Sequence, residues 1–123
     1  MFNKFKKRIY KTGLILEVPP EPMISILATP VTAGSNPAIT DVTYEFINFT
    51  PISATMEIFS YNTVGNTKVG SALYTNNSLN LTSGAHVIND INLPNVPTYG
   101  NNYIIELSTN TITGTLEIPI VAP

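Results

Sequence analysis

The chain has 123 residues, a length that accommodates one folded domain with a two-layer core but not two independent domains. It contains no cysteine, which excludes a disulfide framework, a thiolate zinc site and a cysteine nucleophile. Charged residues make up only 11% of the chain, so its polar surface must consist largely of Thr, Asn and Ser, which favour strands and turns over helices.

Charge is unevenly divided along the chain. Five of the six cations lie within the first eleven residues: Lys4, Lys6, Lys7, Arg8 and Lys11. Lys68 is the only cation that follows, and all eight acidic residues lie beyond the basic end. The formal net charge of −2 therefore hides a basic N-terminal segment on an acidic body.

Residues 1–11, the basic arm, have the periodicity of a short amphipathic helix. Phe2, Phe5 and Ile9 fall on one side of such a helix, and the cations fall on the other side or at its boundary. This pattern fits the headgroup region of an anionic membrane, and the same charges would neutralise nucleic-acid phosphates. A solubilising tail or a contact with protein are the alternative interpretations. The residues predicted to make the contact are Phe2, Lys4, Phe5, Lys6, Lys7, Arg8, Ile9 and Lys11.

A proline-rich spacer follows the basic arm. Residues 12–22 end in Pro19-Pro20-Glu21-Pro22, and three prolines in four residues disfavour a helix and favour an extended segment. We therefore predict a boundary here, with the basic arm and spacer in residues 1–22 and a β domain in residues 23–123.

Export and membrane insertion are not expected. A secretory signal needs an apolar core of about seven or more residues, whereas the only apolar run near the start is Leu14-Ile15-Leu16. No stretch approaches the roughly 20 apolar residues that span a bilayer. We expect synthesis in the cytoplasm without a signal peptide.

The body alternates between apolar-rich runs and turn signals. The predicted strands are residues 23–28, 40–47, 54–61, 68–74, 78–81, 86–93, 102–108 and 115–121. Short strands at near-regular spacing, separated by Gly, Pro and Asn, predict an all-β sandwich or barrel without helices.

Alternation within the strands predicts which side chains face the core. The predicted core residues are Val42, Tyr44, Phe46, Met56, Ile58, Val87, Ile91, Leu93, Tyr103, Ile105, Leu107, Leu116, Ile118 and Ile120. The run 102–108 is predicted to be a central strand. Pro119 cannot donate to a ladder, which places the last strand at an edge or a bulge.

Candidate catalytic groups are few. Glu57, Glu106 and Glu117 lie on the faces opposite the core and could line up as an acidic patch on neighbouring strands, which we interpret as a solvated face. Phe59 and Tyr61 share the outward face with Glu57. The single histidine, His86, follows a turn and is interpreted as structural. We predict no catalytic, metal-binding or cofactor-binding residue and no enzymatic activity.

Two families resemble this chain. The segment Tyr99-Gly100-Asn101-Asn102-Tyr103-Ile104-Ile105-Glu106-Leu107 is similar to the entry into the penultimate strand of fibronectin type III and immunoglobulin-like modules. The layout of a short arm before eight strands resembles the single-jelly-roll penton and minor capsid proteins of icosahedral, membrane-containing bacteriophages. The fold expected is a single β-sandwich with a basic N-terminal arm, a jelly roll being favoured over an immunoglobulin-like topology.

The second resemblance implies a non-enzymatic structural protein of a virion, located at a vertex or in the shell. Its sandwich would contact other capsid proteins and copies of itself, and its basic arm would contact an inner membrane or the genome. No small-molecule substrate is expected. The alternative is an immunoglobulin-like adhesion module that recognises a glycan or a surface protein.

Overall fold

The structure, a computed structural model, describes residues 18–123, and no helix occurs among them. The strands are β2 (Met23–Ala28), β3 (Val31–Thr32), β4 (Ala38–Ile47), β5 (Ala54–Asn62), β6 (Thr67–Asn76), β7 (His86–Leu93), β8 (Asn102–Thr109) and β9 (Thr113–Val121). Seven of the predicted strands are present, with ends that differ from the prediction by no more than two residues.

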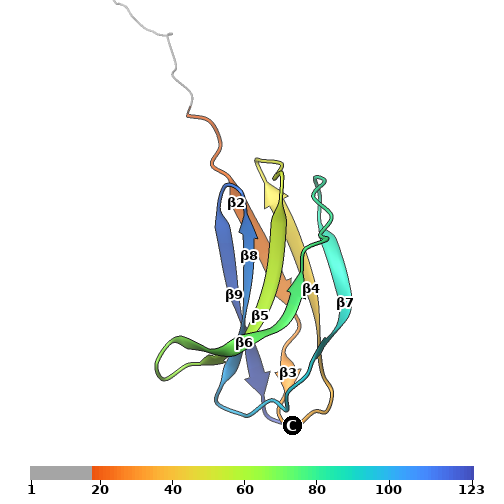
Figure 1. The fold of residues 1–123 in the computed structure, drawn as a ribbon, viewed down its shortest axis with the longest axis vertical. Coiled ribbons are helices and arrows are strands. Elements are labelled where there is room, and N and C mark those ends of the chain that lie inside the picture. The colour runs from red at the N-terminus through yellow and green to blue at the C-terminus, as the bar shows by residue number, and fades with distance from the viewer. Residues whose placement is uncertain (1–17) are drawn as a thin grey trace, which may run out of the picture.

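The strands form two sheets. The small sheet has the order β2-β4-β7 and the large sheet the order β3-β9-β8-β5-β6. All pairings are antiparallel except the short parallel pairing of β3 with β9. The two sheets (Figure 1) enclose one shared core, so residues 18–123 have the all-β, two-layer arrangement of a sandwich.

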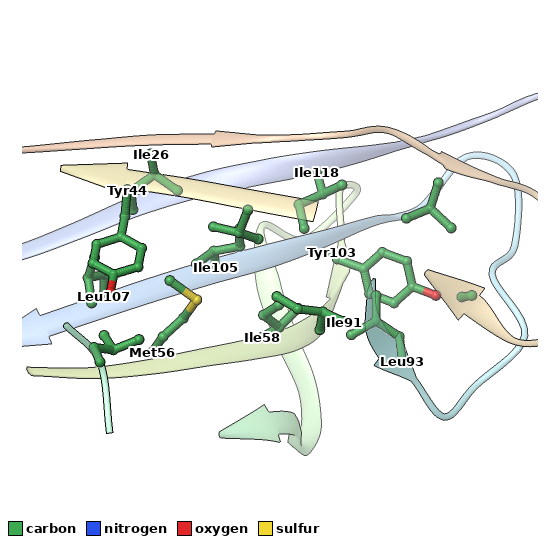
Figure 2. Close-up of a cluster of buried hydrophobic side chains, with 14 of the residues drawn as sticks. Ile26, Tyr44, Met56, Ile58, Ile91, Leu93, Tyr103, Ile105, Leu107 and Ile118 are labelled. Atoms are coloured by element: carbon green, nitrogen blue, oxygen red, sulfur yellow. The ribbon is translucent and has the colours of Figure 1, made fainter. Parts of the chain in front are cut away.

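The core is built by alternation along each strand. On β8, Tyr103, Ile105 and Leu107 are no more than 1% exposed, whereas the residues between them are half-buried on the outer face. Figure 2 shows Leu107 beside Tyr44 of the small sheet and Tyr103 beside Leu93 of the same sheet. Burying each such side chain contributes about 1.5–3 kcal/mol. Because β8 lies between β9 and β5, the prediction of a central strand is confirmed.

One predicted core residue lies on the outside. Val87 is 57% exposed, because the pairing of β7 with β4 shifts register at a bulge. The backbone at Asp90 has a φ of 57°, and its N–H donates to Asp41 Oδ1 at 2.8 Å. One extra residue in a strand reverses which side chains face the core. Ile91 therefore points inward beyond the bulge, while before it Ile88, not Val87, packs against the core.

The predicted strand at residues 78–81 is wrong. This segment is a loop whose Leu79 is only 9% exposed. The Tyr44 hydroxyl donates to the Asn80 carbonyl at 3.1 Å and accepts from the Asn80 N–H at 2.9 Å. Because the Tyr44 hydroxyl bonds to both the carbonyl and the N–H of Asn80, these two backbone groups do not pair with a neighbouring strand.

The short strand β3 was not predicted. Its two residues pair with Ile120 and Val121, immediately after Pro119. The predicted edge position of the last strand is therefore wrong, since β9 lies between β3 and β8. Pro119 itself lies just outside the stretch that pairs with β3, so its missing N–H does not interrupt that pairing.

The basic arm and spacer residues up to 17 lie outside the described residues. Residues 18–22 are exposed and form neither helix nor strand, and they extend away from the start of β2, at the end of the molecule opposite the C-terminus (Figure 1). One hydrogen bond, from Asn48 Nδ2 to the Glu21 carbonyl at 3.1 Å, joins this segment to the loop after β4.

Candidate functional sites

The outer face of the large sheet brings the three predicted glutamates together. Glu57 on β5 lies directly opposite Glu106 on β8, and Glu117 on β9 lies opposite the neighbouring position Ile104. Lys68 on β6 donates to both carboxylate oxygens of Glu106 at 3.0 Å. The sequence therefore predicted the alignment of these acids, but the strand order decided that a lysine reaches one of them.

These contacts make the face an internally paired surface. Lys68 Nζ also lies 4.5 Å from the centre of the Phe59 ring, a cation–π distance, and Asn102 Nδ2 donates to Glu117 Oε1 at 2.9 Å. Within residues 18–123, no group of three or more His, Asp or Glu side chains could hold a metal ion. A carboxylate pair with one member bound to lysine is poorly arranged for acid/base chemistry, which needs one carboxyl group protonated.

His86 contacts the loop that precedes β7. It is the first residue of β7, its ring centre lies 5.4 Å from that of Tyr44, and its Nε2 lies 2.8 Å from the Thr82 carbonyl. These contacts attach residues 77–85 to β4, as expected of a structural histidine.

The outer face of the small sheet is different in character, and we call it the small-sheet face. Leu27, Thr43 and Val87 form a row across its three strands, and Met23 and Ile39 add further exposed apolar side chains at its two ends. The central row borders a shallow groove of about 330 Å³. This face was not predicted, because alternation placed Val87 in the core, although the sequence of β2 is apolar on both faces.

A second hollow, the end pocket, lies where the β5–β6 hairpin meets the segment that joins β7 to β8. It has a volume of about 330 Å³ and is lined by Ser60, Tyr61, Asn62, Val69, Asn95, Val96, Thr98, Asn101 and Asn102. This pocket was not predicted, because nothing in the sequence places the segment before β8 beside β5.

The floor of the end pocket is held by a buried tyrosine. The Tyr103 hydroxyl donates to Asn95 Oδ1 at 3.0 Å, and Asn95 Nδ2 donates to Ser60 Oγ at 3.1 Å. Burial raises the pKa of Tyr103 above its ordinary value, which keeps the hydroxyl protonated as a donor. Burial likewise raises the pKa of Tyr44, and the hydrogen bond with Asn80 only partly opposes this.

Comparison with known proteins gives no relative. No protein-family model, no curated protein and no solved structure matches this chain. The described part of the chain, residues 18–123, has no helix that could cross a bilayer.

Proposed function

We propose that the sandwich is immunoglobulin-like rather than a jelly roll. A jelly roll folds a long hairpin over itself, so that its first and last strands pair, whereas here β2 and β9 belong to different sheets. Immunoglobulin-like modules place the first, second and fifth strands (A, B and E) in one sheet and strands G, F, C and C′ in the other. The strand order supports this assignment, with β2, β4 and β7 as A, B and E and residues 77–85 in the place of strand D.

Tyr103 adds support for the same assignment. In many immunoglobulin-like domains a tyrosine near the start of strand F bonds back to the segment that precedes the strand. Tyr103 is the second residue of β8, and its hydroxyl bonds to Asn95 in that segment. The acceptor is a side chain here, whereas a backbone group is usual.

We propose that the protein is a non-enzymatic structural component of an assembly, joined through the small-sheet face. The observation that carries this proposal is the exposure of Met23, Leu27, Ile39 and Val87, which ranges from 45% to 66% on one side of one sheet. Apolar side chains gathered in this way mark surfaces that another protein covers.

The charge of the small-sheet face supports one kind of partner. Asp41 and Glu45 lie among its apolar residues, and Lys68, the only Lys or Arg within residues 18–123, is bound to Glu106 on the other sheet. A covering surface that supplies both apolar groups and cations would match this face. A second copy of the chain has both in residues 2–11, and we propose a homo-oligomer.

A virion shell is the setting that best accounts for this charge division. A shell protein contacts its own copies laterally and an anionic layer, lipid or nucleic acid, beneath. Five cations in the basic arm of an otherwise acidic chain fit both contacts. The protein would be made in the host cytoplasm and reside in the virion.

Light scattering on the full chain tests the assembly proposal. We expect concentration-dependent oligomers, and we expect the double variant Leu27→Ser, Val87→Ser to be monomeric while keeping the circular dichroism spectrum of a folded β protein, with a melting temperature that no longer depends on concentration. Ile52→Ser is the matched control, since Ile52 is 84% exposed in the loop between β4 and β5. A wild type that is monomeric at every concentration, or a double variant that still assembles, would overturn the proposal.

The contact of the basic arm has its own test. The intact chain should pellet with anionic liposomes or retard nucleic acid in a salt-dependent way, and deletion of residues 2–11 should abolish this binding. Which of the two ligands is bound identifies the anionic layer. Equal binding by the deleted form would exclude this role of the arm.

A further inference from the structure

The end pocket is lined by uncharged, mostly polar side chains. Of its nine lining residues, four are asparagine, three carry a hydroxyl group and two are valine. None carries a charge at neutral pH. A site for phosphate, a nucleotide or a metal ion would need cations, carboxylates or a cluster of backbone N–H groups, so this lining favours a neutral ligand.

Several polar groups of the lining are left available. Tyr61, Thr98 and Asn101 make no side-chain hydrogen bond to any other residue within the described part of the chain, and Asn62 uses only its Oδ1, which accepts from the Val64 N–H at 2.9 Å. Each amide offers donors and an acceptor side by side, and each hydroxyl can act in either sense. A ligand with several adjacent hydroxyl groups can satisfy this mixture.

The walls of the pocket are fixed by bonds outside it. Thr63 Oγ1, in the turn of the β5–β6 hairpin, donates to the Gly100 carbonyl at 3.0 Å, and the Pro97 carbonyl accepts from the Gly34 N–H at 2.9 Å. Asn95 is held between Ser60 and Tyr103. Because the two sides are tied together in advance, a ligand would not have to order them, which lowers the cost of binding.

We propose that the end pocket binds a neutral saccharide. Amide and hydroxyl groups would exchange hydrogen bonds with the sugar hydroxyls, while Val69, Val96 and the ring of Tyr61 supply apolar surface for the carbon face. The volume of about 330 Å³ is at the low end for small-molecule sites and fits one or two sugar units at the end of a chain. Glycan recognition was also the alternative function that the sequence suggested for an immunoglobulin-like module.

Titration of the full-length, isotope-labelled protein with neutral sugars, followed by NMR, tests this proposal. The panel is glucose, galactose, mannose, N-acetylglucosamine and their disaccharides, with glucuronate and inorganic phosphate as charged controls. We expect saturable shifts of residues 60–62 and 95–102 with at least one neutral sugar and none with the charged controls.

Two variants locate the site. Asn101→Ala removes an exposed amide without a partner in the described residues and should weaken binding about fivefold, the change for one lost hydrogen bond. Val69→Phe places a ring in the pocket and should abolish binding. Asn89→Ala, an exposed asparagine on the opposite sheet, is the matched control and should bind normally.

Three results would overturn the proposal: no shift with any neutral sugar, shifts that map outside the pocket, or normal binding by both pocket variants. The pocket shares no residue with the small-sheet face. Its failure and the failure of assembly are therefore separate outcomes.

Discussion

The two outer faces of the sandwich differ in how their charged side chains are paired. On the large sheet, polar and charged side chains bond to one another, as Lys68 does to Glu106 and Asn102 to Glu117. On the small sheet, apolar side chains stand between Asp41 and Glu45 with no cation from residues 18–123 beside them. The first face thus has internal partners for its charges, and the contrast is consistent with our proposal that a partner covers the second.

The largest effect is expected from a change beneath both faces. Ile58 is fully buried, so Ile58→Ala should lower the free energy of unfolding by about 2–5 kcal/mol. Chemical denaturation followed by circular dichroism measures this. Both sheets should unfold in one transition, because they share one core; separate transitions would show that the faces belong to independent units.

Alkaline pH should weaken the same core. Burial raises the pKa of Tyr44 and of Tyr103 in the folded state, so their contribution is fully present below the unfolded pKa of about 10 and is lost as pH rises through the higher folded values. The melting temperature should therefore hold from neutral pH to about pH 9 and fall above pH 10. Tyr44→Phe should reduce the fall in melting temperature above pH 10. If this variant has the same pH profile as the wild type, ionisation of Tyr44 does not cause the fall.

A smaller effect should follow from removing the carboxylate that supports the bulge of the small sheet. Asp41→Ala deletes the acceptor of the Asp90 N–H and should cost about 1 kcal/mol, since water can partly replace it at this exposed site. Asp41→Asn retains an oxygen at the same place and should cost less. If both variants unfold like the wild type, the Asp41 contact is not what stabilises the bulge.

The smallest effect should come from the paired face. Lys68→Gln removes an ion pair whose side chains are 42% and 25% exposed, and such pairs contribute about 0.2–1 kcal/mol, less at high salt. Glu57→Gln should instead stabilise by a few tenths of a kcal/mol, because Glu57 lies opposite the like charge of Glu106. Thermal melts at low and high salt measure both, and a large loss from Lys68→Gln would show that this face depends on a single pair.

Much of the fold could be predicted from alternation and turn residues. The strands at 23–28 and 86–93 match the structure at both ends, and the inward faces of β4, β5 and β8 are as predicted. The prediction that Val87 faces the core was wrong, because side chains alternate between the two faces of a strand only until an extra residue is inserted. That insertion, the bulge at Asp90, is held by a hydrogen bond to Asp41 on another strand. The predicted contact residues of the arm stay a prediction, since residues 1–17 lie outside the described part of the chain.

The candidate sites, too, could be predicted only in part. That Glu57, Glu106 and Glu117 share the outer side of their strands follows from the sequence, whereas the reach of Lys68 to Glu106 required β6 to lie beside β5. The end pocket could not be predicted, because Asn95 and Ser60, which bond directly to each other, are 35 positions apart and are brought together only by the folded chain.

The sequence by itself determined that the body of the chain is built of strands, which of its residues alternate into the core apart from Val87, and that the cations gather at one end, because these depend on local spacing and composition. Only the tertiary structure decided which strands are neighbours, which faces stay open and where the pocket lies. Pairing between distant strands is set by packing over the whole domain, and no local pattern carries that information.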